Sequence, residues 1–209
     1  LAVVAFYYPL AFWSLRGMET GVLSALMTWA MVFALRQQEA PNRTRLFALC
    51  AMAAALILVR QDALIFVIVL GGYLCVTALP KRRAAGAVVL ASAILALGLL
   101  TAFRWFYFGD VTPNTYALKV TGVSLDERLQ RGLSVLFSPS MLLHFALIIA
   151  ALALSLSGIR ALPRAKLVAM TLPISAVLAQ AAYSAYVGGD VWEDLGHPNR
   201  FIVIVMPCL

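Results

Sequence analysis

The chain has 209 residues, of which 63% are hydrophobic and only 12% are charged. Soluble domains are usually about half apolar and about a quarter charged, so this composition argues against a soluble domain and predicts a polytopic membrane protein. The formal net charge of +7 does not indicate a nucleic-acid partner, because the basic residues stand in short clusters between apolar runs, as in proteins oriented in a membrane.

Long apolar runs follow one another along the chain, and their length and lack of alternation favour helices over barrel strands. The runs cover residues 1–15, 21–35, 46–59, 63–79, 84–103, 133–157 and 167–187, and another begins at 201. We therefore expect an all-α bundle of about seven or eight membrane-spanning helices. Because the chain starts and stops inside apolar runs, we expect residues 1–209 to be a single transmembrane domain cut from a longer protein.

Two charged interruptions near the start each have two interpretations. Glu19 either complements the dipole of the following helix, with Thr20 as its cap, or faces a ligand. Arg60 and Asp62 divide the run 46–79 and form either an ion-paired turn or an anion site. One long tilted helix with both charges buried is the alternative to two short helices, but it would place the basic loops on different faces.

The basic clusters predict the orientation of the bundle. Nine of the 16 basic residues fall in three loops, which the positive-inside tendency places in the cytoplasm: 36–45, 80–83 and 160–166. Strict alternation then puts the remaining interruptions on the outer face: 16–20, 60–62, 104–132 and 188–200. This outer face carries every carboxylate except Glu39.

The longest polar stretch, 104–132, contains the sequence YFGDVTPNTYALK at 107–119. We expect a turn at Gly109 and Asp110, followed by a short helix capped by Asn114 and running through Lys119. Aromatic residues before the turn and polar groups after it suit a sugar platform or a lipid head group. An interfacial loop anchored by aromatic residues is the other interpretation.

The loop between Tyr186 and Phe201 gathers polar groups between two apolar runs. Gly188 and Gly189 allow positive φ and a close approach of the backbone, which would deliver Asp190 to a site. Trp192 offers a face on which a sugar ring can stack. Four residues of this loop are of types that can bind a divalent metal, although no fixed ligand spacing supports such a site. They are Asp190, Glu193, Asp194 and His197.

Four motifs in order resemble those of bacterial GT-C glycosyltransferases, in particular the group of the terminal mycobacterial arabinofuranosyltransferase. The motifs are GMET at 17–20, Arg60-Gln61-Asp62, YFGDVTPNTYALK at 107–119 and GGDVWE with NRF within 188–201. The resemblance covers nearly the whole chain, from Trp13 to Pro207. Family members often have Arg-Pro-Asp/Glu-Gly where this chain has Arg60-Gln61-Asp62-Ala63, and many have a shorter segment where it has Glu193–Asn199.

The resemblance implies transfer of a sugar from a polyprenyl-phosphate donor to an extracytoplasmic glycan or lipid acceptor, in a bacterial inner membrane. It also implies a single inverting displacement, whose catalytic carboxylate is expected upstream of Leu1. For the donor phosphate our candidates are Arg60, Lys119 and Arg200. For sugar or acceptor binding they are Glu19, Asp62, Asp110, Asn114, Asp190, Trp192, Glu193 and His197.

Two other functions remain open from the sequence. A transporter or flippase for a lipid-linked sugar or an anionic solute predicts charges near mid-helix, whereas here the charges lie at the ends of the apolar runs, which favours an enzyme. A non-catalytic scaffold is the third alternative. In all three cases we expect the lipid bilayer as a partner, no nucleic acid, and no cofactor other than the metal left open above.

Overall fold

The computed structural model describes residues 7–77, 83–112, 116, 120–139, 141, 144–146, 149–150, 153, 163–190 and 197–209. Every regular element within these ranges is helical, which confirms the helical part of the fold prediction for the described residues. The chain divides into two compact units, which are taken separately below. The first unit contains Leu1–Thr20 and Gly122–Leu209, and the second contains Gly21–Thr121.

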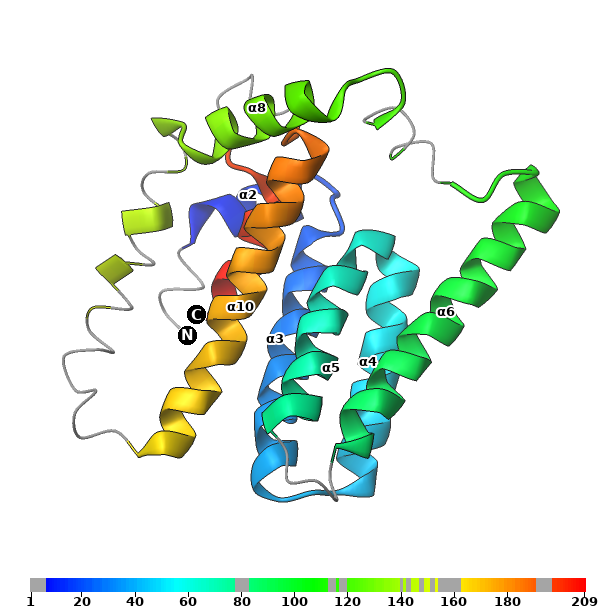
Figure 1. Cartoon of the computed structure of the whole chain (residues 1–209), viewed down its shortest axis with the longest axis vertical. Helices are drawn as coiled ribbons and strands as arrows, with labels where there is room; N and C mark the ends of the chain where they lie inside the picture. The colour runs from blue at the N-terminus through cyan, green and yellow to red at the C-terminus, as the bar shows by residue number, and fades with distance from the viewer. Residues whose placement is uncertain are drawn as a thin grey trace. The chain divides into compact units, whose positions relative to one another are not determined.

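The second unit is built from helices in chain order (Figure 1). They are α3 (Thr20–Glu39), α4 (Arg43–Val59), the 3₁₀ turn η1 (Gln61–Ala63), α5 (Leu64–Thr77) and α6 (Ala84–Phe108). Asn42 caps α4 by accepting from the backbone N–H groups of Thr44 and Arg45, and Gly109 ends α6 with φ 73°. Both α4 and α5 pack against α6, and their apolar side chains are buried between them.

The first unit is assembled around α10 (Arg164–Val187). Its other helices are α2 (Tyr8–Leu15), α8 (Leu125–Leu136), α11 (Arg200–Val203) and the 3₁₀ turn η5 (Met206–Cys208). A capping box starts α8, since Ser124 accepts from the Glu127 N–H and the Glu127 carboxylate accepts from the Ser124 N–H. In Figure 1, α8 crosses the C-terminal end of α10 and packs against it. The helix α11 contacts both α10 and α2.

The prediction of seven or eight membrane spans is wrong. Of the described helices, two are long and apolar enough to cross a membrane, namely α6 and α10. The apolar runs elsewhere fold into shorter helices: α4 has 17 residues and α5 has 14. At the usual rise, 14 residues extend about 21 Å, less than the ~30 Å of a bilayer core. Although α3 has 20 residues, its last turn is polar.

Two predicted spans are also interrupted locally. Leu133, where a span was expected to start, lies inside α8, and a turn at Phe137 and Ser138 follows that helix. At the other end, the run from Phe201 forms the four-residue helix α11 and then η5, which contains Pro207. Too many spans were therefore predicted because several apolar runs form helices that are too short to cross a membrane.

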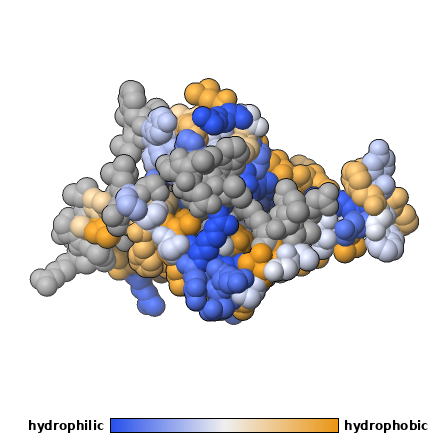
Figure 2. All heavy atoms as spheres, turned by 90° about the horizontal axis from the view of Figure 1, so that it is seen from above, coloured by the Kyte–Doolittle hydropathy of each residue, from blue (hydrophilic) through white to orange (hydrophobic). Residues whose placement is uncertain are grey.

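Other expected features are present. The chain breaks at Arg60, where φ is −152°, so the described part of the run, residues 46–77, is divided between α4 and α5 and is not one long helix. The expected helix 84–103 continues to Phe108, because the aromatic residues after Phe103 remain helical until Gly109. Figure 2 shows hydrophobic residues on the surface beside hydrophilic ones. The assignment of loops to outer and cytoplasmic faces stays a prediction.

Candidate functional site

The polar site of the first unit begins where α10 ends. Gly188 and Gly189 have φ of 80° and 75°, a left-handed conformation in which a side chain would be strained. Their N–H groups donate to the carbonyls of Ala185 (3.2 Å) and Ser184 (2.8 Å), which closes the helix end. The predicted positive φ is thus confirmed, and the turn leaves Asp190 only 3% exposed.

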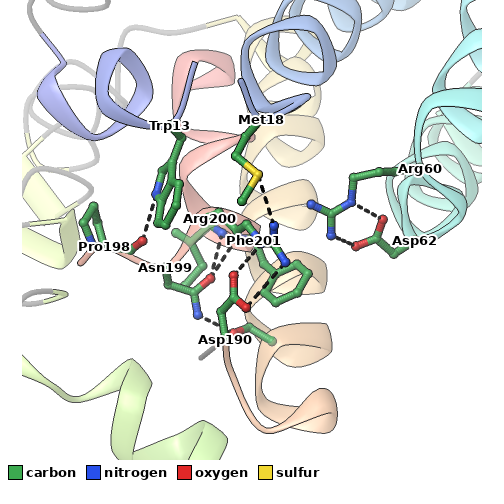
Figure 3. A network of polar contacts seen from close by, with 11 residues as sticks. Trp13, Met18, Arg60, Asp62, Asp190, Pro198, Asn199, Arg200 and Phe201 are labelled. Atoms are coloured by element: carbon green, nitrogen blue, oxygen red, sulfur yellow. Dashed lines mark hydrogen bonds and ion pairs between the residues drawn. The ribbon is translucent and has the colours of Figure 1, made fainter. Parts of the chain in front are cut away.

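Asp190 forms an ion pair with Arg200, the first residue of α11 (Figure 3). The guanidinium presents two nitrogen atoms to the carboxylate: Nε contacts Oδ2, and Nη2 donates to Oδ1 at 3.4 Å. The Arg200 side chain is 18% exposed, so the arginine remains accessible from outside while its partner is buried. Arginine suits this arrangement because its planar group matches a carboxylate in two places.

The third member of this network is Met18. Arg200 Nη1 lies 3.7 Å from Met18 Sδ and donates to it. The indole Nε1 of Trp13, five residues earlier, donates to the carbonyl of Pro198 at 2.9 Å. These two contacts bring Trp13 and Met18 to the C-terminal end of the 188–200 loop, within one compact unit.

Asn199 positions Arg200. Its side-chain oxygen accepts from the N–H groups of Phe201 (2.9 Å) and Ile202 (3.3 Å), which caps α11. Its Nδ2 donates to the hydroxyl of Ser184 on α10 at 2.6 Å, and Asn199 is fully buried. Asn199 was not among the site residues predicted from the sequence, although an asparagine before a helix start is a recognised N-cap signal.

His197 lies in an aromatic cluster with α2. Its ring centroid is 4.7 Å from that of Phe12 and 6.2 Å from that of Trp13. The guanidinium carbon of Arg16 lies 4.5 Å from the centroid of the same Phe12 ring. The predicted sugar or acceptor role of His197 stays a prediction, and the structure adds that its ring packs on apolar faces.

The predicted pair of the second unit, Arg60 and Asp62, forms its own ion pair (Figure 3). Arg60 Nε donates to Asp62 Oδ1 at 2.8 Å, and Nη2 contacts Oδ2. The two side chains are 15% and 14% exposed, at the extended residue that separates α4 from η1. The interpretation as an ion-paired turn therefore describes the contact that forms, and the anion-binding role of Arg60 stays a prediction.

Asp110 follows α6 in the predicted turn. Its carboxylate accepts from the backbone N–H of Thr112 at 2.9 Å and from the Thr112 hydroxyl at 3.0 Å. These bonds stabilise the charged form and hold the pKa of Asp110 below its usual value. The preceding aromatic residues are exposed, with Phe103 and Tyr107 stacked 5.5 Å apart.

The remaining candidates divide into two groups. Glu19 directly precedes α3. The interpretation with Thr20 as a cap is not met, because the Thr20 hydroxyl is buried and has no partner in the described part of the chain. The ligand-binding role of Glu19 stays a prediction. Four candidates lie outside the described residues, namely Asn114, Lys119, Trp192 and Glu193. Asp194 lies outside them too. Among the residues that the structure describes, no three or more His, Cys, Asp or Glu are grouped as metal ligands.

Comparison of the chain with protein-family models, with curated proteins and with solved structures found no match in any of the three. The function is therefore argued from the residues and their contacts.

Proposed function

We propose that this chain is part of a membrane glycosyltransferase that moves a sugar from a polyprenyl-phosphate donor to an extracytoplasmic glycan or lipid acceptor. The protein would lie in the inner membrane of a bacterium. The observation that carries the proposal is the network of Met18, Asp190 and Arg200. Met18 comes from one motif of the resemblance and the pair of Asp190 and Arg200 from another, and one compact unit brings them into contact.

The chemistry of Arg200 supports a phosphate-binding role. Two of its nitrogen atoms, Nε and Nη2, face Asp190, and Nη1 donates to the thioether sulfur of Met18. Thioether sulfur is a weak acceptor, whereas phosphate oxygens are strong ones. A donor phosphate would replace the sulfur contact while Asp190 keeps the guanidinium in place. Asp190 then serves as a positioning residue, besides the sugar contact predicted for it.

The proposed reaction is a displacement at the anomeric carbon. The acceptor hydroxyl forms a bond to that carbon and gives its proton to a carboxylate, which we expect upstream of Leu1. The bond from the anomeric carbon to the phosphate oxygen breaks, and polyprenyl phosphate leaves with the electron pair. Negative charge grows on the phosphate, where Arg200 would stabilise it.

A membrane location is supported by the exposure of the two span-length helices. Only 22% of the most apolar stretch of α6 and of α10 is buried in the protein, whereas the core helix of a soluble protein is mostly buried. Trp105 and Tyr107, near the end of α6, are 57% and 71% exposed. Aromatic residues of this kind favour the boundary between lipid and water.

The test uses the full-length protein in liposomes with labelled polyprenyl-phosphate sugars and membrane acceptors. We expect label to move to the acceptor, and Arg200→Lys to slow transfer by about a hundredfold, because lysine keeps the charge but loses the planar fork. The matched control is Arg43→Lys, an exposed arginine at the start of α4, which should leave the rate unchanged. Movement of the intact donor between leaflets without transfer would establish the transporter instead, and an unchanged rate in Arg200→Lys would exclude the phosphate role.

A further inference from the structure

The helix α8 carries more apolar surface than its packing covers. Gly132, Val135 and Leu136 are buried, and the close contact of Gly132 with α10 fixes the position of the helix. A Cβ atom at Gly132 would lie 2.3 Å from the carbonyl oxygen of Ala185, so the two backbones touch there. The buried flank therefore holds α8 against the last turns of α10.

A second apolar flank of α8 has no cover in the described part of the chain. Leu125, Leu129 and Leu133 are 50%, 37% and 47% exposed, and Phe137, the C-cap residue directly after the helix, is 73% exposed. Their spacing of four residues places them side by side along the helix, as one stripe next to the buried flank. The remaining face is polar and exposed: Asp126, Glu127, Gln130, Arg131 and Ser134.

The place of α8 identifies what covers this stripe. Ala185 and Tyr186 belong to the end of α10, one of the two helices long and apolar enough to cross a bilayer. The guanidinium of Arg128 on α8 lies 5.0 Å from the Tyr186 ring and donates to the Tyr186 carbonyl at 3.4 Å. Tyrosine and arginine at the end of a span are typical of the lipid–water boundary. In a bilayer crossed by α10, the helix would thus lie at the depth where hydrocarbon changes to head groups.

The charge of α8 restricts the kind of lipid. Two carboxylates, Asp126 and Glu127, are balanced by two guanidinium groups, Arg128 and Arg131. A helix that depends on anionic lipids has an excess of basic residues on its polar face, which α8 lacks. Its contact with a membrane would therefore come from the apolar stripe and would need no anionic head group.

We propose that α8 lies flat in the interface of a neutral phospholipid bilayer, with Leu125, Leu129, Leu133 and Phe137 in contact with the acyl chains. The inference rests on the membrane location in the proposed function, but not on sugar transfer. It makes α8 an interfacial helix that sets the depth of the pair of Asp190 and Arg200 relative to the lipid surface.

The test measures the depth of nitroxide labels in the full-length protein, reconstituted in phosphatidylcholine liposomes after the native cysteines have been replaced by alanine. Labels are placed by Leu129→Cys on the stripe, by Gln130→Cys on the polar face as the matched control, and by Leu178→Cys on α10, where the native leucine is 64% exposed. We expect the labels at 129 and 178 to collide with oxygen more than with a water-soluble nickel chelate, and the label at 130 to show the reverse. High salt should not change this pattern.

Three results overturn the proposal. If the label at 178 is in lipid but the label at 129 is in water, α8 is not interfacial although α10 crosses the membrane. If the label at 129 is hidden from both oxygen and nickel, a protein surface covers the stripe. If both labels are in water, the membrane location fails as well. Sugar transfer is assayed on the same liposomes, so failure of the enzymatic proposal is seen separately from failure of this one.

Discussion

At the scale of single residues, the candidate site depends on a buried carboxylate that is paired with an arginine. Asp190 is 3% exposed, and Arg200 faces it with two nitrogen atoms. A buried charge is tolerated when it is paired and hydrogen-bonded, and becomes costly when its partner is removed. The pair should therefore be visible in stability as well as in function.

Removing either partner should destabilise the first unit. We expect Asp190→Asn and Arg200→Gln each to lower the free energy of unfolding by about 3 kcal/mol, because each leaves one charge without its partner. The double variant should lose less than the sum of the two single variants. Denaturant unfolding of the detergent-solubilised protein measures all three. The control is Asp126→Asn on the exposed face of α8, which should lose no more than about 1 kcal/mol because its helix-start charge and its bond from Gln130 are exposed. Additive losses would show that the two groups do not interact.

The second prediction at this scale concerns Asp110. The backbone N–H and the hydroxyl of Thr112 lower its pKa, so the turn is stabilised at pH above the unfolded pKa and this stabilisation is lost as the pH falls through the lower, folded value. Thr112→Val removes the hydroxyl bond and should raise the pKa of Asp110 towards its ordinary value. An NMR titration of labelled carboxyl carbons measures the change, with the exposed Thr121→Val as control. If the pKa of Asp110 is the same in Thr112→Val as in the unchanged protein, the Thr112 hydroxyl does not contribute to lowering it.

The sequence predicted local features of the site better than distant ones. The positive φ at Gly188 and Gly189 follows from the residue type, and the Arg60–Asp62 pair joins residues two positions apart. The contact between Met18 and Arg200 spans 182 positions. No periodicity or spacing encodes such a contact, because it depends on how α2 and α11 pack against each other. The role of Asn199 was within reach, since its cap is local.

At the scale of elements, the sequence predicted a turn at the glycine where one helix ends, but not the polar cap where another helix begins. Gly109 ends α6, and Asn42 starts α4. The number of spans was predicted wrongly because the length of an apolar run does not determine the length of the helix that it forms. In α8 the residues from Leu133 onward complete an amphipathic helix that starts at a capping box, and its polar first half decides where the helix begins.

The contact between α5 and α6 gives a prediction with a matched control on one helix. A Cβ atom at Gly86 would lie 2.5 Å from the carbonyl oxygen of Gly71, whereas at Gly98 it would meet nothing within 4 Å. We expect Gly86→Ala to lower the free energy of unfolding by about 1–3 kcal/mol through overpacking. Gly98→Ala should be neutral or stabilise by up to about 1 kcal/mol, because alanine favours the helix.

Denaturant unfolding in detergent compares these two variants. Both substitutions add one methyl group to α6, so a general effect of alanine on the helix would shift them together. Equal shifts would mean that the close approach of the α5 and α6 backbones does not limit the side chain at position 86.

At the scale of the whole molecule, the composition predicted a membrane protein. Two of the described helices are long and apolar enough to fit that prediction. Composition describes the whole chain, whereas a helix crosses a bilayer only if that helix is itself long and apolar enough. Among the described helices, α6 and α10 meet this condition. Both carry exposed apolar residues near their middle, with Leu95 and Leu178 each 64% exposed. In water such surface is costly, whereas in lipid it is the favoured surface.

A charge at the middle of α6 therefore separates the two environments. We expect Leu95→Lys to reduce the amount of full-length protein that remains in membranes after an alkaline wash, because a lysine at the centre of a span costs about 2.5–3.5 kcal/mol on insertion scales. Tyr107→Lys, near the end of the same helix, should have little effect, since a terminal lysine reaches the head groups. If α6 is instead exposed to water, Leu95→Lys should leave the distribution unchanged or raise the soluble yield. The two lysine variants add the same charge at exposed positions of one helix, so the difference between them reports the depth of each position in the bilayer.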